Sequence, residues 1–254
     1  MKKYLEKYLA NRPLFLAFIR ATEANIYERH KPLAGPELDV WCGDGFFVKT
    51  VFGRLDVGVD VADSRMRLAQ AEGVYREMKE FDGVTIPVGS GRFGTVICNC
   101  TLEHVERLRP LLKEIYRTLK PGGVVLTTVM ARPWEENLFG SMFLGNSYRN
   151  WMRKKQIHLN LLSRDGWRRE FDMAGFKVTN EEGYLSPRAC KWLDVFHYLS
   201  LPSLVFHTFT GKWVGWPNVI SIEWLSRLGR ERVAPDCAGA IFYALVKARS
   251  SRGE

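Results

Sequence analysis

The 254-residue sequence has few cysteines, and their spacing builds neither a disulfide scaffold nor a zinc site. Their number is odd and no Cys-x-x-Cys pair occurs; they are Cys42, Cys98, Cys100, Cys190 and Cys237. No secretory leader is expected, because the apolar run from Leu14 to Ile19 is too short. These absences favour free thiols in a reducing cytosol and exclude an extracellular, disulfide-stapled protein.

The chain also lacks internal repeats, low-complexity linkers and the unbroken apolar stretch of about 20 residues that a transmembrane helix needs. Charged residues make up 26% and hydrophobic residues 46%, which excludes a disordered chain. Lys and Arg number 37 against 28 Asp and Glu, a net charge of +9. This excess indicates an anionic partner but does not choose among nucleic acid, phospholipid and an acidic metabolite.

Strands and helices are predicted to alternate along the chain. The expected helices are 12–29, 46–52, 64–72, 105–119 and 164–174, the last capped by Ser163. The expected strands are 37–42, 55–61, 93–98, 124–129, one beginning at Phe176 and 238–246, with a weaker one at 84–88. This alternation favours an α/β fold with a mostly parallel sheet and helices on both faces.

Two segments are longer than the connections that a minimal domain of alternating strands and helices needs. They are 131–162 and the aromatic-rich 187–233, which we call the aromatic insertion. Long connections in a compact domain are usually functional. We therefore expect residues 1–35 to form an N-terminal helical cap and residues 36–254 a catalytic domain. Within it, the two insertions would form a lid over the substrate.

A cofactor loop is predicted after the first strand. Gly43 and Gly45 allow close approach of a ligand to the backbone, and Asp60 at the end of the second strand can accept hydrogen bonds from ribose hydroxyls. A Gly-x-Gly turn followed by an acid is shared by nicotinamide and other adenosine binders. On these residues alone, a glycine turn packed on a helix remains the alternative.

Five ordered motifs resemble the class I S-adenosylmethionine-dependent methyltransferases: LDVWCGDGFF, VGVDVADSRMRLAQA, FDGVTIPVGSGRFGTVICNCTLEHV, IYRTLKPGGVVLTTV and LSRDGWRREFDMAGFKV. The resemblance covers about residues 36–183 and the final strand, and is greatest to the small-molecule subgroup with a Leu-Glu-His-Val motif. It implies a Rossmann-like, seven-stranded sheet and S-adenosylmethionine as cofactor. It assigns cofactor contacts to Asp39, Trp41, Cys42, Gly43, Gly45, Asp60, Val61, Asp82, Gly83, Cys98, Asn99 and His104.

Two residues depart from the family's pattern. Trp41 stands where the family usually has glycine, so either the loop is reshaped around the indole or cofactor binding has been lost. We favour the reshaped loop. Gly94 replaces an aspartate, a change expected to affect local capping.

Methyl transfer requires alignment of the acceptor and, where the acceptor carries a proton, a base. The candidate bases are His104, next to the cofactor motifs, and His158, before the helix that follows the first insertion. Catalysis by proximity alone remains open. We expect Cys98 and Cys100 to be small apolar residues rather than nucleophiles, and no metal-ligand constellation is present.

Arg149, Arg153, Lys154 and Lys155 form a basic cluster, and two further clusters occur at 164–169 and 227–232. They suit either solvated helix faces or contact with phosphate. The aromatic insertion carries Asp194 as its single charge between Lys191 and Lys212, and Pro202 divides it. We read it as an interfacial hairpin or a lid over an apolar acceptor.

The sequence therefore predicts a cytoplasmic methyltransferase of small-molecule biosynthesis. Its acceptor would be bulky and apolar, or lipid-linked. Peripheral contact with an anionic membrane, at its inner face, is an expected partner interaction, and homodimer formation is left open. The alternatives are an RNA methyltransferase, the weaker reading because no RNA-binding module is recognisable, and a non-catalytic binding or scaffold protein of the same fold.

Overall fold

The structure is a computed structural model that describes residues 1–211 and 220–248, and the chain divides into two compact units. The helical unit comprises Met1–Arg29, Ala131–His158 and Gly183–Ile241. The sheet unit comprises His30–Met130, Leu159–Glu182 and the residues from Phe242 onward. Trp213 and Trp216 of the aromatic insertion lie outside the described residues.

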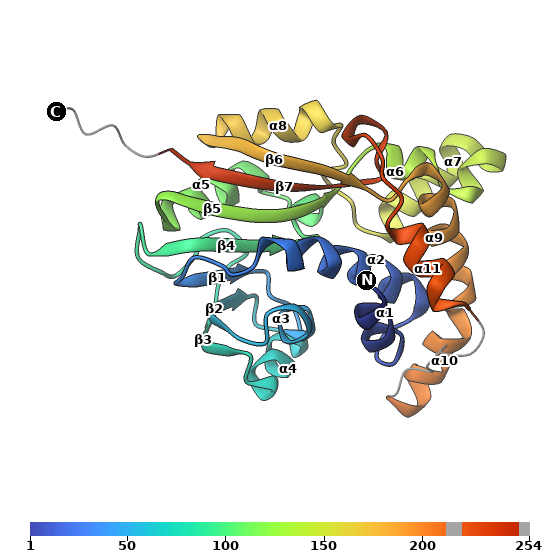
Figure 1. Ribbon diagram of the computed structural model, residues 1–254, viewed down its shortest axis with the longest axis horizontal. Helices are drawn as coiled ribbons and strands as arrows, with labels where there is room; N and C mark the ends of the chain where they lie inside the picture. Colours follow the sequence, from blue (N-terminus) through green and yellow to red (C-terminus); the bar gives the residue numbers. More distant parts are fainter. Residues whose placement is uncertain (212–219, 249–254) are drawn as a thin grey trace. The chain divides into compact units, whose positions relative to one another are not determined.

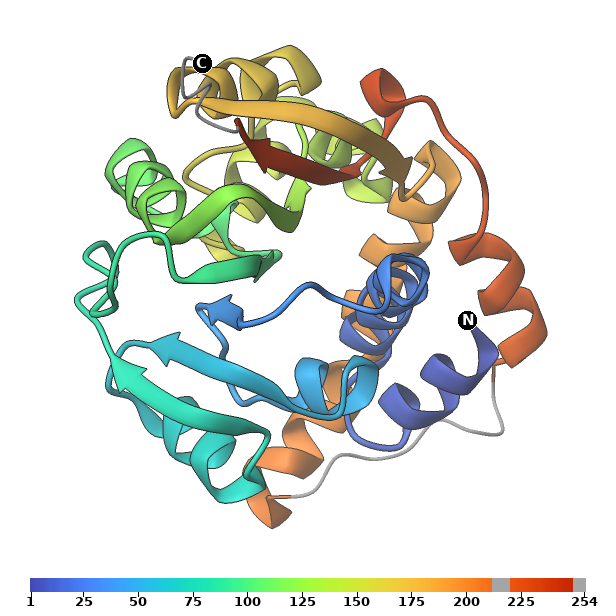
Figure 2. The ribbon, with the colours of Figure 1, turned by 60° about the vertical axis from the view of Figure 1, so that its left-hand side comes forward.

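One seven-stranded sheet organises the sheet unit, in the order β3-β2-β1-β4-β5-β7-β6 (Figure 1). The strands are β1 (Glu37–Val40), β2 (Leu55–Asp60), β3 (Tyr75–Glu80), β4 (Phe93–Asn99), β5 (Leu119–Met130), β6 (Phe176–Tyr184) and β7 (Ala240–Lys247). The four pairs from β3 to β5 are parallel. Figure 2 shows β6 and β7 running in opposite directions. The sheet is therefore mostly parallel, and its order reverses between β1 and β4, where ligands bind in such folds.

The helices of this unit are α3 (Phe46–Val51), α4 (Ser64–Glu72), α5 (Leu108–Thr118) and α8 (Arg164–Met173), with the short 3₁₀ turn η2 (Leu102–His104). Aromatic pairs fix two of them on the sheet. Tyr116 of α5 meets Phe176 edge-on at 5.2 Å, and Phe171 of α8 meets Tyr243 at 5.0 Å. Ser163 caps α8 through a hydrogen bond from the Gly166 amide (3.2 Å), as its position predicts.

The predicted strand at 84–88 is wrong. These residues form a loop, whose Ile86 and Val88 carbonyls accept hydrogen bonds from Arg117 (both 2.9 Å). The strand lies earlier, at β3, where Tyr75 is the one buried residue. β3 is at the end of the sheet, and an edge strand need not bury apolar side chains, so its sequence YREMKE carries no apolar pattern.

The helical unit is built from the N-terminal segment and parts of both insertions. Its helices are α1 (Lys2–Leu9), α2 (Leu14–Tyr27), α6 (Pro133–Glu136), α7 (Phe139–Lys155), α9 (Pro187–Leu199), α10 (Leu201–Thr210) and α11 (Ile222–Gly229). Two 3₁₀ turns, η1 (Glu28–His30) and η3 (Pro235–Cys237), follow α2 and α11 along the chain. The predicted helix 12–29 is confirmed as α2, which packs on α9 through Phe18 and Phe196, 5.6 Å apart. Ser200 alone separates the end of α9 from the start of α10 at Leu201, and Pro202 is the second residue of α10, so the predicted break near Pro202 is also confirmed. No helix within the described residues is long and apolar enough to cross a bilayer.

Candidate functional site

The turn after β1 combines two glycines with left-handed backbone. Gly43 has φ +59° and Gly45 has φ +72°, values that L side chains rarely adopt. A Cβ at Gly45 would lie 2.8 Å from Cγ2 of Val74, so this glycine lets the start of α3 pack closely. A Cβ at Gly43 would have no atom within 4 Å. Gly43 therefore borders open space, as a ligand-facing turn requires.

Two buried acids lie near this turn, Asp60 at the end of β2 and Asp39 in β1. The Asp60 carboxylate, 1% exposed, accepts hydrogen bonds from the amides of Gly43 and Val61 (2.5 and 2.8 Å). Asp39 accepts one from the hydroxyl of Tyr75 (2.7 Å). Burial raises the pKa of both groups, that of Asp39 to about 7 with a further contribution from the Asp60 charge. A cationic ligand beside them would favour their ionised forms.

Trp41 adopts a left-handed conformation (φ +60°) and packs its indole against the segment after β3. The ring meets Phe81 edge-on at 5.2 Å, and a Cβ on Gly83 would lie 3.2 Å from its Cζ2. Its Nε1 is buried without a hydrogen-bond partner. The indole thus lies beside Asp82 and Gly83, whose loop is held by hydrogen bonds from Val84 and Thr85 to the Asp82 carboxylate (2.8 and 2.6 Å). These bonds lower the pKa of Asp82.

The end of β4 lies at the same carboxyl edge of the sheet as the turn after β1. Cys98 is fully buried, and burial raises its pKa well above the ordinary value; burial likewise raises the pKa of Cys42. Both thiols are thereby kept protonated and poorly nucleophilic. Asn99 accepts a hydrogen bond from the Thr128 hydroxyl of β5 (2.8 Å). His104 ends η2 with an exposed side chain.

Glu103 is the residue of this region that the sequence analysis did not single out. It is fully buried, and burial raises its pKa. Its carboxylate accepts hydrogen bonds from the Cys100 thiol (3.1 Å) and the Met130 amide (3.2 Å), while its Oε2 atom has no partner. Its carbonyl accepts the amides of Leu159 and Asn160 (2.8 and 2.9 Å). The sequence carries no signal of this burial beyond the position of Glu103 between Leu102 and His104.

His158 belongs to the helical unit, not to the sheet unit that holds the other predicted site residues. Its side chain is buried, with its ring edge-on to Trp134 at 4.7 Å. The predicted residues therefore fall into three groups. The first is the turn formed by Asp39, Cys42, Gly43, Gly45, Asp60 and Val61 with Trp41, Asp82 and Gly83 beside it; the second is Cys98, Asn99 and His104; the third is His158 alone.

Gly94 has a steric role, so the expected effect on capping is wrong. A Cβ at this position would lie 2.6 Å from the carbonyl oxygen of Ala34 and 2.8 Å from that of Gly35. The Gly94 amide donates to the Pro36 carbonyl (2.9 Å). The close approach of two backbone segments leaves no room for an aspartate side chain.

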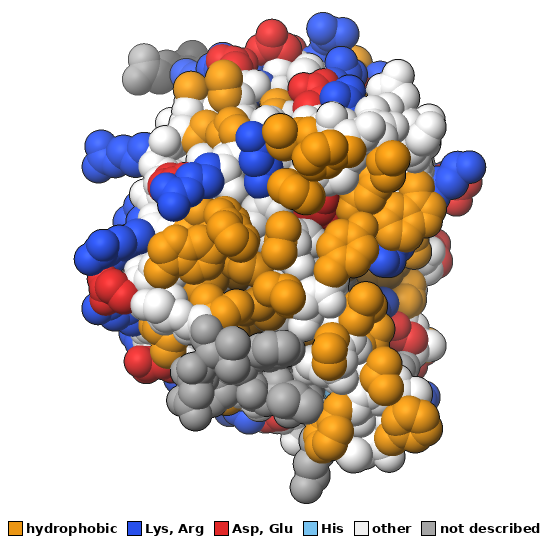
Figure 3. Space-filling view, turned by 90° about the vertical axis from the view of Figure 1, so that its right-hand side faces the viewer, with side chains coloured by type: hydrophobic (Ala, Val, Ile, Leu, Met, Phe, Trp, Pro, Cys, Tyr) orange, Lys and Arg blue, Asp and Glu red, His pale blue; other side chains and the backbone are white. Residues whose placement is uncertain are grey.

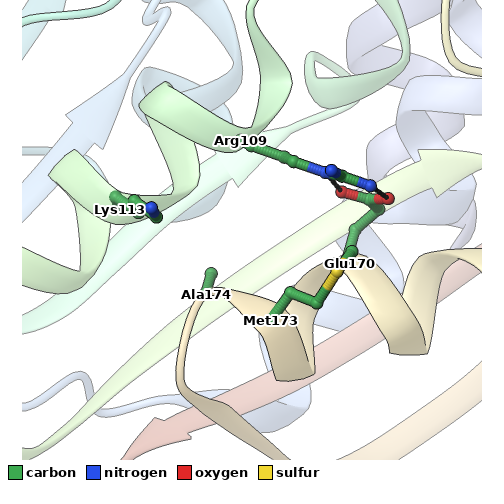
Figure 4. A pocket seen from close by; sticks show the side chains of 5 residues that line it. All are labelled: Arg109, Lys113, Glu170, Met173 and Ala174. Carbon is green, nitrogen blue, oxygen red and sulfur yellow. Dashed lines mark hydrogen bonds and ion pairs between the residues drawn. The ribbon is translucent and has the colours of Figure 1, made fainter.

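A pocket between α5 and α8 contains none of the predicted residues. It is lined by Arg109, Lys113, Glu170, Met173 and Ala174, and the Arg109 guanidinium forms two hydrogen bonds with Glu170 across it (Figure 4). Across the described residues, no group of three or more His, Cys, Asp or Glu side chains is arranged to hold a metal ion.

Residues 2–181, more than half of the chain, match a family described as a methyltransferase domain. The chain belongs to the class I S-adenosylmethionine-dependent methyltransferases. Its cofactor is S-adenosylmethionine. Two features of the turn are compatible with this molecule: the Asp60 carboxylate lies at the Gly43 amide, and Gly43 borders open space.

The methyltransferase is similar to several curated proteins. It is 26% identical over 140 residues to an uncharacterized protein of Methanocaldococcus jannaschii, covering 55% of this chain and 62% of that protein. It is 25% identical over 191 residues to the ubiquinone biosynthesis O-methyltransferase of Nitrobacter winogradskyi, covering 71% and 73%. The match to the mitochondrial enzyme of Rattus norvegicus covers only 36% of that protein.

Solved structures share the fold. A S-adenosylmethionine-dependent methyltransferase from Thermotoga maritima has a TM-score of 0.60 at 16% identity, covering 92% of this chain and 91% of that one. Geranyl diphosphate C-methyltransferase from Streptomyces coelicolor, in complex with S-adenosyl-L-homocysteine, has a TM-score of 0.58 at 16% identity. It covers 90% of this chain and 79% of that one.

Proposed function

We propose that the protein transfers the methyl group of S-adenosylmethionine to a bulky apolar small molecule or a lipid-linked acceptor. The observation that carries this proposal is the turn after β1, in which buried Asp60 accepts the Gly43 amide beside open space. When bound, the cofactor supplies an activated methyl group on a sulfonium. Transfer to the acceptor's nucleophilic atom would leave S-adenosylhomocysteine, and any proton on that atom would pass to a base or to water.

The chain's own residues would position these reactants. Asp60 would hold the ribose, and the indole of Trp41 with Gly83 would form one wall beside the adenine. Asn99, fixed by Thr128, would lie next to the methionine part of the cofactor. Asp39 and Asp60 would offset the positive charge that the cofactor carries. Water exclusion and alignment of the acceptor would then supply most of the rate enhancement.

His104 is the proposed base, with His158 as the alternative. His104 follows Asn99 by five residues in the sheet unit and has an exposed side chain. His158 is buried against Trp134 in the helical unit. If His104 is the base, His104→Asn lowers the rate of methyl transfer at saturating cofactor and acceptor by about 100-fold or more. His158→Asn then leaves that rate within a few fold of wild type.

An apolar acceptor is supported by the chemistry of the insertions and by the names of similar proteins. Segments 131–162 and 187–233 are proposed to form the lid. The chain leaves the sheet unit directly after β5 and near the end of β6 to form them. Ubiquinone and geranyl diphosphate, named in a relative and in a fold neighbour, both carry isoprenoid chains.

Charge argues against RNA as the acceptor. The sheet unit contains 20 Lys and Arg against 19 Asp and Glu, a net charge of +1. RNA-binding surfaces are strongly basic. A proposed cofactor site on a nearly neutral unit favours a neutral or apolar acceptor.

The test is transfer of labelled methyl from S-adenosylmethionine to a total lipid extract, an aqueous metabolite fraction and total RNA. We expect label in the organic phase together with S-adenosylhomocysteine. Asp60→Ala should weaken cofactor binding by about 1.5–3 kcal/mol in calorimetry, the range for hydrogen bonds involving a charged group. Asp60→Asn is the matched variant that keeps the side-chain size. Label in RNA would establish the RNA alternative, and a wild-type protein that binds no cofactor would establish the scaffold alternative.

A further inference from the structure

We propose that the helical unit binds the surface of an anionic phospholipid bilayer through α7 and α10. The inference deepens the proposed function, since it gives the enzyme access to apolar acceptors dissolved in lipid. Vesicle binding is measured without cofactor or acceptor, so its failure is distinguishable from failure of the methyltransferase proposal. Three features of this unit support the proposal. Helix α10 exposes apolar side chains and buries a polar one, helix α7 has an apolar and a basic half, and positive charge is concentrated in this unit.

Helix α10 exposes its apolar side chains and buries a polar one. Ser203 is its only buried residue, whereas Leu201, Leu204, Val205, Phe206 and Phe209 are exposed, Phe209 by 84%. The Thr208 and Thr210 hydroxyls donate to the carbonyls of Leu204 and Phe206 (3.0 and 2.8 Å). Polar groups satisfied within the helix can enter a less polar environment at low cost. This pattern suits a helix that lies in a membrane interface.

Helix α7 changes character at a kink at Gly145 (φ 55°, ψ −133°). Before the kink, Phe139, Met142, Phe143 and Leu144 are exposed, Phe143 by 73%. After it come Arg149, Lys154 and Lys155; the Lys155 ammonium lies 4.6 Å from the centre of the Trp151 ring. Tryptophan and lysine together are typical of the headgroup level of a bilayer.

Acidic side chains are missing from both surfaces. No Asp or Glu occurs between Glu136 and Asp165. Asp194, the one acid between Glu182 and Glu223, is buried and accepts hydrogen bonds from the Tyr148 hydroxyl (2.6 Å) and the Gly140 amide (2.9 Å). Figure 3 shows hydrophobic side chains gathered over much of the face that carries these helices, with Lys and Arg among them and at its edges.

The excess positive charge of the chain is concentrated in this unit. The helical unit contains 17 Lys and Arg against nine Asp and Glu, +8 of the total +9. Some cations are neutralised, such as Arg153 by buried Glu135. Lys154 and Lys155 have no carboxylate partner among the described residues. Apolar side chains flanked by unpaired cations complement anionic headgroups above hydrocarbon, whereas a protein partner or a second copy of this chain would have to present its own acids.

The experiment is sedimentation of the full-length protein with vesicles of phosphatidylcholine alone or mixed with phosphatidylglycerol, at low and high salt. We expect binding to the anionic vesicles that falls severalfold as salt rises. Phe206→Ser with Phe209→Ser, and separately Phe143→Ser with Leu144→Ser, should each reduce binding about tenfold or more. Leu68→Ser is the matched control, because Leu68 is an exposed apolar residue of α4 in the sheet unit and its loss should leave binding unchanged.

A second pair of variants tests the charge. Lys154→Gln with Lys155→Gln should reduce binding and its salt dependence. Arg54→Gln with Lys113→Gln removes the same charge from the sheet unit and should leave vesicle binding and its salt dependence unchanged. Absence of binding to anionic vesicles overturns the proposal. So does a concentration-dependent dimer that the Phe206 and Phe209 substitutions abolish, because a second copy would then be the occupant. Circular dichroism confirms that each variant is folded.

Discussion

Asp39 gives the clearest consequence at the scale of a single residue, because its pKa of about 7 lies near physiological pH. In the unfolded chain an aspartate titrates near 3.9. Between these values the native state binds the proton more tightly, so the free energy of unfolding decreases as pH rises through 7. Between pH 5.5 and 8, we expect the free energy of unfolding of the cofactor-free wild type to fall by about 2 kcal/mol more than that of Asp39→Asn.

Denaturant unfolding of both proteins at the two pH values measures this difference. The asparagine can still accept the hydrogen bond from Tyr75, so the comparison isolates the charge. Equal pH dependence in the two proteins would mean that Asp39 is ionised in the native state throughout this range. Asp60 and Glu103 also have raised pKa values, which is why a variant rather than the wild-type profile alone is needed.

The site residues differ in how far the sequence predicts their placement. The Gly43 and Asp60 pairing follows from the spacing of two motifs, since parallel β1 and β2 end at one edge. The position of the Trp41 indole does not, because it depends on a left-handed backbone and on a loop brought in after β3. Glu103 was missed for a similar reason: its burial results from the end of β5 and the backbone at residues 159–160.

At the scale of elements, Gly45 couples α3 to α4. Gly45→Ala adds a Cβ 2.8 Å from the Val74 side chain and 3.2 Å from that of Ala69, at a φ of +72°. We expect the substitution to lower the free energy of unfolding by about 2–4 kcal/mol, from backbone strain and overpacking together. Gly53→Ala is the matched control, since Gly53 has φ +83° but no atom within 4 Å of a Cβ.

Gly53→Ala should lower the free energy of unfolding only by the contribution of backbone strain, about 1 kcal/mol. Thermal or denaturant unfolding of the two variants gives both values. Equal losses would mean that the α3–α4 packing relaxes around the added methyl group.

Helices and strands whose own sequence carries caps or an apolar pattern were predicted closely. Elements that lack such a pattern were misplaced or given the wrong ends. Helix α4 matches its predicted range of 64–72, because Asp63 caps it and Gly73 ends it in a left-handed conformation. Strand β5 begins five residues before its predicted start, since Lys120 to Gly123 lack the apolar pattern. Strand β3 and the loop at 84–88 were misplaced because pairing at a sheet edge is decided by the neighbouring strand.

At the scale of the whole molecule, cofactor binding should stabilise the sheet unit. A ligand at 100 times its dissociation constant adds about 2.7 kcal/mol to the free energy of unfolding of the part that binds it. We expect S-adenosylmethionine to raise the midpoint of the thermal transition that includes the sheet unit, and Asp60→Ala to diminish this shift at the same cofactor concentration. Differential scanning calorimetry measures it. If the cofactor raises the midpoint of no thermal transition, the proposed cofactor site is contradicted.

The net charge of +9 was visible in the sequence, but its location was not. Residues 1–29, 131–158 and 183–241 are far apart along the chain, and only their common packing places +8 in one unit. The sequence left open whether the basic clusters are solvated faces or phosphate contacts. In the cluster at 164–169, Arg164 and Arg168 both pair with Glu181, so these two side chains are neutralised within the protein. Lys154 and Lys155 of α7, by contrast, have no carboxylate partner within residues 1–211 and 220–248.

The discontinuity of the helical unit has a consequence for how the chain matures on the ribosome. Helices α1 and α2 are synthesised first, yet their partners α9 and α11 follow more than 150 residues later. Translation proceeds at about 5–20 residues per second. The interval between synthesis of α2 and synthesis of Phe196, which packs on Phe18, is therefore on the order of 10–30 s. During that interval α2 can pack on α1 but not on α9 or α11. Helices α1 and α2 of this methyltransferase can therefore complete their native packing only after translation has passed α11.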